Sequence, residues 1–208
     1  MLQVTRANTE GLTAILRFTM SVVNQSYRYR VNADDLLIEV DTLWLAFARE
    51  NGAAELTAAS VLGRSLWDFV QGEAIRAVYE VIHTRVRSSG KSAMFPFRCD
   101  SPTLKRYMRM TIAFAEADQL IYESHILRVE PQRPLVVLDA DQQRSQSFLT
   151  ICSCCKKAML ESVGWLEIEE FVLAMGILES DNIPQLCHSI CPECFKTICR
   201  SVDNNTAA

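Results

Sequence analysis

A strand with one buried face is predicted by the stretch Arg106-Tyr-Met-Arg-Met-Thr-Ile-Ala-Phe114. Large apolar side chains stand at every second position, and because successive strand side chains point to opposite faces, one face should be buried. Strand-like runs also occupy residues 93–99 and 120–129. Pro96 lacks the N–H that a sheet ladder needs, so the first of these runs should be an edge strand or contain a bulge.

Upstream, two short runs at 27–31 and 36–40 flank a polar turn and predict a β-hairpin. A short helix should begin near Asp41, and the apolar spacing over 72–88 predicts a longer one. The order is therefore two strands, several small helices, a longer helix and three strands. It predicts an α+β domain over residues 26–130, built on a five-stranded antiparallel sheet with flanking helices.

The N-terminal segment, residues 1–25, predicts an amphipathic helix, because apolar side chains recur on one helical face between positions 9 and 25. Such a face needs a partner surface. Two partners remain open. The helix docks on its own domain, or it pairs with a second copy of the chain and contributes to a homodimer.

The charge of the chain argues against a nucleic-acid or membrane partner. Its net charge is −4 and its isoelectric point is about 5.5, so no overall positive field draws it to phosphate-rich surfaces. The first residues lack a basic stretch followed by an apolar one, and no apolar run is long enough to span a bilayer. The sequence predicts a cytoplasmic protein.

Two cysteine pairs near the C-terminus, 35 residues apart, are the sharpest chemical signal: Cys152-x-x-Cys155 and Cys191-x-x-Cys194. Two such knuckles supply four soft thiolate ligands, which is typical of a structural zinc site. Residues 148–208 are too few to hold a large core, so we expect a zinc-stabilised module there, after a linker at 131–147. A thiol-disulfide switch and unliganded core thiols remain alternatives.

Neighbouring residues leave the ligand set open. His188, which precedes the second pair, could be a ligand in a site of three cysteines and one histidine, or could support the fold around it. Cys187 and Cys154 are further alternates, and as thiols beside the four ligands they are the candidates for redox reactivity. Between the pairs, the spacing over 164–175 predicts a helix that carries Trp165 and packs beside the site.

The N-terminal residues resemble the PAS family of sensor domains, in particular a bacterial subfamily. The likeness covers about residues 27–130 and is carried by three motifs. They read Val40-Asp-Thr-Leu-Trp-Leu-Ala-Phe-Ala-Arg-Glu-Asn-Gly52, Val61-Leu-Gly-Arg-Ser-Leu-Trp-Asp-Phe69 and Phe97-Arg-Cys-Asp-Ser-Pro102. In the PAS strand order, the run that contains Pro96 lies at a sheet edge.

The cysteine pairs are similar to a module that follows this type of PAS domain in some bacterial proteins. The matching stretches are Cys152-Ser-Cys-Cys-Lys156 and His188-Ser-Ile-Cys-Pro-Glu-Cys194. This chain departs from the family pattern at three positions. Cys154 replaces a tryptophan, Cys187 replaces a serine or threonine, and Ser189 replaces a glycine.

The PAS resemblance implies a cavity between sheet and helices that holds haem, flavin, a small metabolite or nothing. Its plausible walls are Trp44, Phe47, Trp67, Phe97 and Met110. Packing of an ordinary core explains these residues as well. Haem needs an axial ligand, and the candidate His83 is expected at the solvent border of the 72–88 helix. The cysteine motif of photoactive flavin-binding domains is missing, so the sequence argues against both cofactors.

Catalytic motifs such as Gly-rich nucleotide loops and the hydrolase Gly-x-Ser-x-Gly turn do not occur, so we do not expect an enzyme. The sequence predicts a cytoplasmic signalling or adaptor protein, in which a change in the PAS domain reaches a protein partner through the zinc module. Two alternatives stay open. One is a thiol- or metal-based redox sensor with PAS as the dimerising scaffold, and the other is a PAS enzyme that binds flavin.

Overall fold

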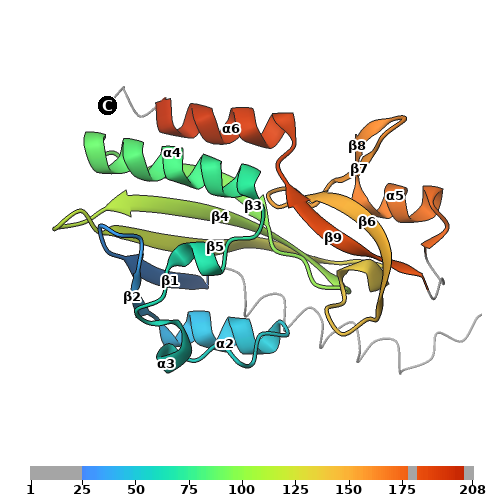
Figure 1. The fold of residues 1–208 in the computed structure, drawn as a ribbon, viewed down its shortest axis with the longest axis horizontal. Coiled ribbons are helices and arrows are strands. Elements are labelled where there is room, and N and C mark those ends of the chain that lie inside the picture. The colour runs from blue at the N-terminus through green and yellow to red at the C-terminus, as the bar shows by residue number, and fades with distance from the viewer. Residues whose placement is uncertain (1–24, 178–181, 204–208) are drawn as a thin grey trace, which may run out of the picture.

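Figure 1 shows a computed structural model that describes residues 25–177 and 182–203. The N-terminal part contains β1 (Ser26–Val31), β2 (Leu37–Val40), α2 (Thr42–Glu50), α3 (Ala58–Val61), η1 (Leu66–Asp68), α4 (Glu73–Ser89), β3 (Ala93–Arg98), β4 (Leu104–Phe114) and β5 (Leu120–Pro131). The C-terminal part contains η2 (Val136–Leu138), β6 (Arg144–Cys152), β7 (Ala158–Leu160), β8 (Gly164–Leu166), α5 (Ile168–Ala174), β9 (Ile183–Ser189) and α6 (Pro192–Asp203). The helix expected over residues 9–25 lies outside the described residues, apart from its last position.

Strands β1 to β5 form one sheet in the order β2-β1-β5-β4-β3, and every neighbouring pair is antiparallel. This arrangement confirms the five-stranded α+β fold of PAS type that the sequence predicts. The run that contains Pro96 is β3, and it lies at the edge of the sheet as expected. An edge strand tolerates proline because one side of it makes no ladder within the sheet.

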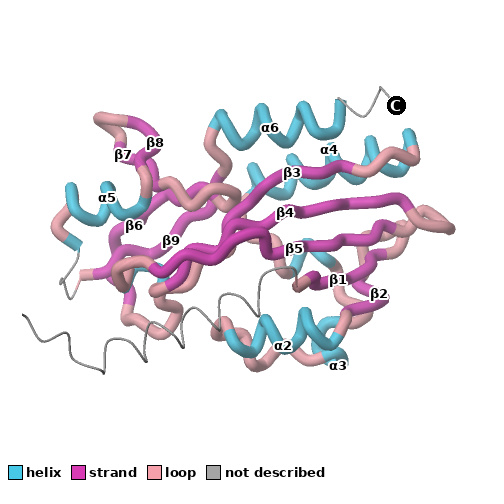
Figure 2. Tube along the Cα trace, turned by 180° about the vertical axis from the view of Figure 1, so that it is seen from behind, coloured by secondary structure: helices cyan, strands magenta, loops and turns pink. Residues whose placement is uncertain are grey.

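The face of the sheet that carries Met108, Met110 and Ile112 is buried, as their alternation predicts. Val78 and Ile82 of α4 pack in the same core, together with residues from the small helices. Phe114, the last apolar residue of the alternating set, is 39% exposed because it lies where β4 ends. Figure 2 shows the sheet from behind, with α4 and α6 along one side of it.

Local signals place the helix ends where the sequence predicts them. Asp41 caps α2, because its carboxylate accepts a hydrogen bond of 2.5 Å from the backbone N–H of Trp44. Gly90 ends α4 in the left-handed region, with φ +68, which suits a residue without a side chain. Between Gly72 and Gly90, α4 is 17 residues long and spans about 25 Å of the sheet.

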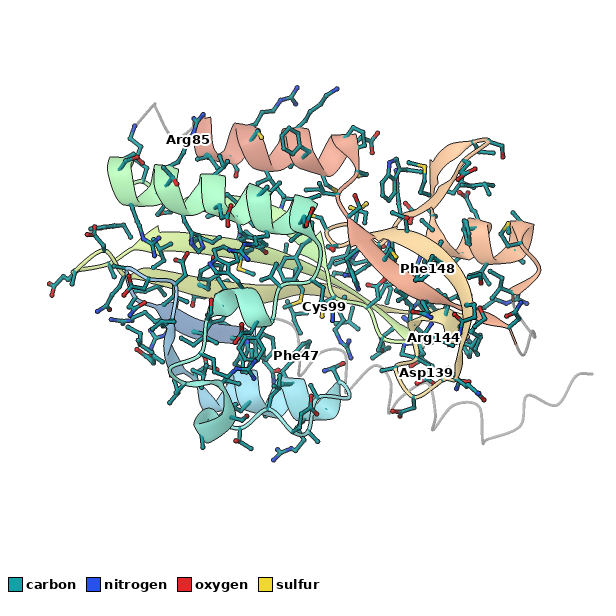
Figure 3. All side chains as sticks on the ribbon, viewed as in Figure 1. Phe47, Arg85, Cys99, Asp139, Arg144 and Phe148 are labelled. Atoms are coloured by element: carbon teal, nitrogen blue, oxygen red, sulfur yellow. The ribbon has the colours of Figure 1, made fainter. Side chains whose placement is uncertain are left out.

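The C-terminal part has its own four-stranded sheet, in the order β8-β7-β6-β9. Strands β6 and β9 are parallel, whereas β6, β7 and β8 form an antiparallel meander. Leu135 and Val137, from the range expected to be a linker, are buried in its core, and β6 begins at Arg144 within that range. The Arg144 side chain donates to the carbonyl groups of Val137 and Asp139, which holds this segment against the module (Figure 3).

The helix expected over residues 164–175 is wrong in its first part. Trp165 lies on β8 opposite Met159, and α5 begins only at Ile168. Gly164 has φ +102, a backbone conformation outside the right-handed helical region. The apolar spacing therefore reflects a short hairpin followed by a short helix.

The two parts of the chain pack against each other. Helix α6 lies beside α4 and against β3 (Figures 1 and 2). Gly72, immediately before α4, marks a close approach, because a Cβ atom there would lie 2.6 Å from the carbonyl oxygen of His188. The start of α4 and the end of β9 are therefore in direct contact.

Candidate metal centre

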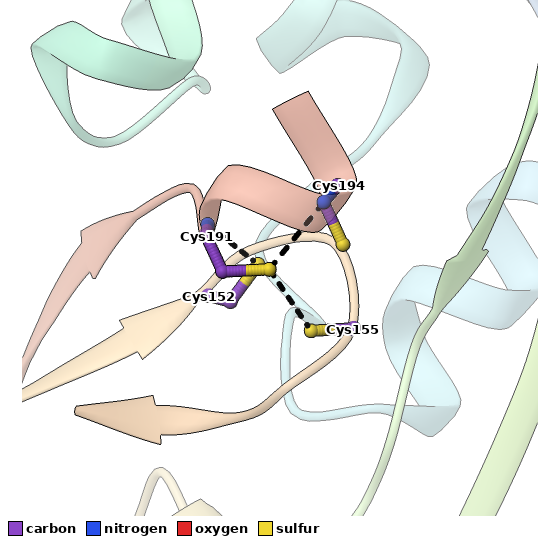
Figure 4. Close-up of side chains that lie close together, drawn as sticks. All are labelled: Cys152, Cys155, Cys191 and Cys194. Carbon is purple, nitrogen blue, oxygen red and sulfur yellow. Dashed lines mark hydrogen bonds between the residues drawn. The ribbon is translucent and has the colours of Figure 1, made fainter. Parts of the chain in front are cut away.

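The first cysteine pair lies in the tight turn between β6 and β7. Cys152 ends β6, where its N–H donates to the carbonyl of Lys157 at 2.7 Å and its carbonyl accepts from the N–H of Lys156 at 3.0 Å. Lys156 adopts φ +64, and this left-handed residue reverses the chain. The turn brings the side chain of Cys155 back toward that of Cys152 (Figure 4).

The second pair lies where β9 leads into α6. Cys191 directly precedes the helix, Pro192 occupies the first helical position, and Cys194 lies in the first turn. Proline is favourable there because the N–H that it lacks would have no helical partner. Strands β6 and β9 are parallel, with Cys152 opposite Ser189, so both cysteine pairs arrive at the same end of the sheet.

The four Sγ atoms all lie within 4.8 Å of one another. Those of Cys155 and Cys191 are 3.7 Å apart. Four thiolates at about 2.3 Å from a tetrahedral zinc ion stand about 3.8 Å from one another, whereas a disulfide brings two sulfurs to about 2.05 Å. The spacing therefore fits four thiolates around one metal ion, and the four cysteines are free thiols.

Backbone amides point at two of the sulfurs. The N–H of Cys191 donates to the Sγ of Cys152 at 3.4 Å, and the N–H of Cys194 donates to the Sγ of Cys191 at 3.5 Å (Figure 4). Such donors stabilise sulfur in its charged form, and the start of α6 adds the positive end of a helix dipole. The backbone donor therefore favours the thiolate form of Cys152, the form that a metal ion binds.

Proton sharing among the thiols sets their pKa values. Hydrogen bonds from the thiols of Cys155 and Cys194 lower the pKa of Cys152 far below the ordinary value for a thiol. The same sharing raises the pKa of Cys155 to about 12 and also raises that of Cys194. Since metal ions bind thiolates, binding must release these protons, and the apparent affinity should rise with pH.

The thiols differ in their exposure. Cys152 and Cys191 are buried, whereas Cys155 and Cys194 are partly exposed. The exposed two line a groove of about 620 Å³, whose other walls include Tyr107 and Leu127 of the sheet. A metal ion or an oxidant could reach the thiols through this groove.

The three alternates lie outside the group of four thiols. Cys154 is buried, and its S–H donates to the carbonyl of Pro96 at 3.2 Å. His188 is hydrogen-bonded through Nδ1 to Ser153 at 3.3 Å, and burial lowers its pKa. Cys187 is exposed on β9. The structure therefore separates the two extra thiols, because Cys154 packs against the PAS sheet and Cys187 faces solvent.

The first knuckle also covers the edge strand β3. The N–H of Arg98 donates to the carbonyl of Cys154 at 2.7 Å, next to the contact between Cys154 and Pro96. The guanidinium of Arg98 bonds to Asp100 and, across the junction, to Glu167 at 3.0 Å. Unpaired backbone groups on an edge strand invite association with other chains, and here the knuckle satisfies two of them.

The five residues expected to line a sensor pocket take part in core packing. Trp67 and Met110 belong to the core beneath α4. Trp44 and Phe47 of α2 pack in a second cluster near the start of β1. Phe47 is labelled in Figure 3. Phe97 borders both clusters. These side chains thus lie on the buried face of the sheet, divided between the regions under two different helices.

The expectation that His83 lies at the solvent border is wrong, because it is only 2% exposed. Its Nδ1 is 2.9 Å from Oδ1 of Asp35, and its Nε2 is hydrogen-bonded to the hydroxyl of Tyr122. Arg87 donates to the same oxygen of Asp35 at 2.7 Å. Both ring nitrogens have protein partners, so His83 offers no free nitrogen to a haem iron.

Comparisons with known proteins add the following. No family model matches the chain, and no curated protein matches it. A sensory box sensor histidine kinase from Vibrio cholerae aligns at 11% identity over 58% of this chain and 97% of that one, with a TM-score of 0.38. The PAS domain of an HTR-like protein from Haloarcula marismortui aligns at 18% identity over 58% and 98%, with a TM-score of 0.32.

At these low scores, the strand order of the chain itself carries the assignment of the fold. That order and the four converging thiols define an α+β domain of PAS type followed by a four-cysteine module. Among the described helices, none is both long and apolar enough to cross a bilayer.

Proposed function

We propose that this chain is a cytoplasmic PAS-domain signalling or adaptor protein, in which a change in the sensor domain reaches a protein partner through the cysteine module. One observation carries the proposal. Cys152, Cys191 and Ile198 of the module are buried in the same core as Val78 and Ile82 of α4. Because close-packed side chains transmit displacement, a shift of α4 would move α6 and the metal ligands at its start.

Zinc is the metal that we propose for the four thiolates, in a structural role. An all-cysteine set at tetrahedral spacing is typical of closed, structural zinc sites. Such an ion contributes about 10–16 kcal/mol of apparent binding free energy in small modules at neutral pH, which is as large as the net stability of a whole domain. The fold of the module should therefore depend on the ion.

A redox sensor is the second candidate, with the thiols as its input and PAS as the dimerising scaffold. It is favoured by the groove, because Cys155 and Cys194 line it and are partly exposed. Thiolate ligands that an oxidant can reach could lose the metal on oxidation. An enzyme that binds flavin in the PAS domain is a weaker alternative, and we propose no enzymatic activity for the chain.

One titration separates the first two candidates. The full chain is purified under reducing conditions without chelator, its metal content is measured, and a mild oxidant is added while zinc release is followed. One zinc per chain that survives the oxidant supports the structural role. Release that parallels thiol oxidation supports the sensor, and a zinc content far below one per chain contradicts the structural role. The visible spectrum of the same sample would reveal haem or flavin.

The coupling of the two parts is tested by Ile82→Ala, which removes buried volume from α4 without touching the module's sequence. We expect hydrogen exchange in α6 to accelerate together with that in α4. Val137→Ala, in the separate core of the module, is the matched control and should leave α4 unchanged. If the Ile82→Ala effect stops at α4, the proposed route from sensor to module does not exist.

A further inference from the structure

The four thiols of the candidate metal centre divide into a buried pair and an accessible pair. Cys152 and Cys191 are 0% and 1% exposed and belong to the core that the module shares with α4. Cys155 and Cys194 are partly exposed, and both line the groove of about 620 Å³. A molecule that approaches the centre through this groove therefore meets Cys155 or Cys194 first.

Backbone hydrogen bonds distinguish Cys194 from the other three thiols. The N–H of Cys191 donates to the Sγ of Cys152 at 3.4 Å, and the N–H of Cys194 donates to the Sγ of Cys191 at 3.5 Å. A hydrogen bond from the backbone of Lys157 acts to lower the pKa of Cys155. Within residues 25–177 and 182–203, no backbone N–H donates to the Sγ of Cys194. Because such donors stabilise a thiolate in place, Cys194 is the thiol that should be displaced most easily.

The groove has the size and the walls of a small-molecule site. Phe97, Tyr107 and Leu127 of the PAS sheet supply most of its apolar surface, and Thr197 of α6 supplies a hydroxyl group one turn beyond Cys194. Binding sites for small molecules commonly have volumes of about 300–1,000 Å³ and combine apolar walls with a few polar groups. A small thiol can therefore enter the groove and reach Cys194.

We propose that this groove binds a low-molecular-weight thiol, which displaces Cys194 from the metal ion. The inference rests on the zinc site proposed above. The incoming sulfur binds as a thiolate in the position that Cys194 leaves. The proton that the incoming thiol loses balances the proton that the displaced Cys194 takes up, so the exchange needs neither an oxidant nor a reductant.

Displacement of Cys194 should loosen the start of α6 and leave the rest of the helix in place. Cys194 lies in the first turn of α6, whereas Ile198, one turn later, is 5% exposed and packs in the shared core. The other three thiols stay with the ion at this step. Zinc loss from the chain should therefore depend on the concentration of small thiols as well as on oxidation.

Transfer of zinc from the full chain to metal-free carbonic anhydrase tests the proposal, because this acceptor is too large to enter the groove. The zinc-loaded chain is kept without oxygen in a phosphine reductant, and glutathione is added at increasing concentrations. We expect the transfer rate to rise in proportion to the glutathione concentration. S-Methylglutathione, which has no free thiol, is the control and should not accelerate transfer. A rate that does not depend on glutathione overturns the proposal.

A larger side chain in the groove wall tests the route. Leu127 is 46% exposed on β5, where tryptophan is well tolerated in a strand, so Leu127→Trp should narrow the groove without touching a thiol. The glutathione-dependent rate should fall at least about fivefold, with the zinc content unchanged. Leu62→Trp makes the same change at a leucine that is 41% exposed and lies outside the groove, and it should have no effect. Equal rates in the wild type and Leu127→Trp overturn the groove as the route.

The order of alkylation identifies the displaced thiol in the wild-type chain. The zinc-loaded chain is treated with limiting N-ethylmaleimide, and the modified cysteines are located by mass spectrometry of peptides. Cys187, which is exposed and lies outside the group of four, gives the reference rate. Among the four proposed ligands, we expect Cys194 to be modified first. Modification that begins at Cys155 or at the buried pair overturns the assignment to Cys194.

Zinc content, measured before each experiment, separates this proposal from the structural role of the metal. A chain that binds no zinc overturns both. A chain that holds one zinc, and loses it at a rate that small thiols do not change, overturns the exchange alone.

Discussion

At the scale of single residues, the junction between the two parts depends on two residues that each make a close contact across it. Cys154 stands between two proposed metal ligands but bonds to the carbonyl of Pro96 on β3. Gly72 has φ +95 and lies against the backbone of His188. Cys154 lies outside the group of four converging thiols, and both residues fix how the module meets the PAS domain.

Cys154→Ala should therefore lower stability without removing the metal. The change deletes a buried S–H donor and leaves a small void, which together should cost about 1–2 kcal/mol in the free energy of unfolding. Cys191→Ala should instead reduce zinc well below one per chain. Metal analysis and urea unfolding of both variants would check this, with Cys187→Ala, at an exposed thiol, as the control. Loss of zinc in Cys154→Ala would contradict the assignment.

Gly72→Ala should destabilise the chain by about 1–3 kcal/mol, because an alanine is strained at φ +95 and its Cβ would collide with the carbonyl of His188. Gly52→Ala is a matched control, since Gly52 also has a positive φ, +84, but has no atom within 4 Å of a Cβ. Urea unfolding of both variants gives the difference. Equal costs would mean that the contact with His188 contributes nothing.

At the scale of elements, α4 connects the PAS hairpin turn, the sheet and the module. Its His83 and Arg87 bind Asp35 of the β1–β2 turn, and His83 also binds Tyr122 of β5. Burial acts to raise the pKa of Asp35, but the hydrogen bonds from His83 and Arg87 outweigh it and lower that pKa. Asp35 is thereby held as a carboxylate within a largely buried network.

This network predicts a specific loss of stability in acid. A carboxyl group whose folded pKa is lowered stabilises the fold fully above its unfolded pKa of about 3.9, and this contribution is lost as pH falls through the folded pKa. The free energy of unfolding should therefore decrease below about pH 4. Asp35→Asn should be less stable at neutral pH and show a shallower decline, as measured by urea unfolding between pH 3 and 7. An unchanged slope would exclude Asp35 as a source of the decline.

At the scale of the whole molecule, the module and the PAS domain share one hydrophobic core and are not joined by a linker alone. Cys152 and Cys191 belong both to that shared core and to the group of four thiols that could hold a metal ion. Helix α6 covers part of α4, and the first knuckle covers the edge of β3. Loss of the proposed metal ion should therefore first weaken the contact between α6 and α4 and the contact between the first knuckle and β3.

Chelation of the metal tests this expectation by hydrogen exchange. Removing zinc should raise exchange of the amides in α6, and of Arg98, whose N–H bonds to Cys154, by at least about tenfold. The central strands β1 and β5 should keep their protection, since their ladder does not involve the module. Re-addition of zinc should reverse the effect. Protection of α6 that survives chelation would show that its position does not depend on the ion.

Much of the fold was predictable because it depends on local patterns. The alternation in β4 predicted its buried face, Asp41 predicted the start of α2, and Pro96 predicted an edge strand. The prediction for Trp165 was wrong because an apolar spacing alone does not distinguish a short hairpin from a helix. His83 was misplaced because its burial requires polar partners from elements distant in the sequence.

The spacing of the cysteine pairs was sufficient to identify four thiols that would converge, because a C-x-x-C turn is a local geometry. Residue identities also predicted the order of the PAS-type elements, since strand and helix periodicities are properties of short segments. Only the tertiary structure separated Cys154 from Cys187, buried His83, and placed α6 beside α4. Those features depend on contacts between segments far apart in the chain, which no local pattern encodes.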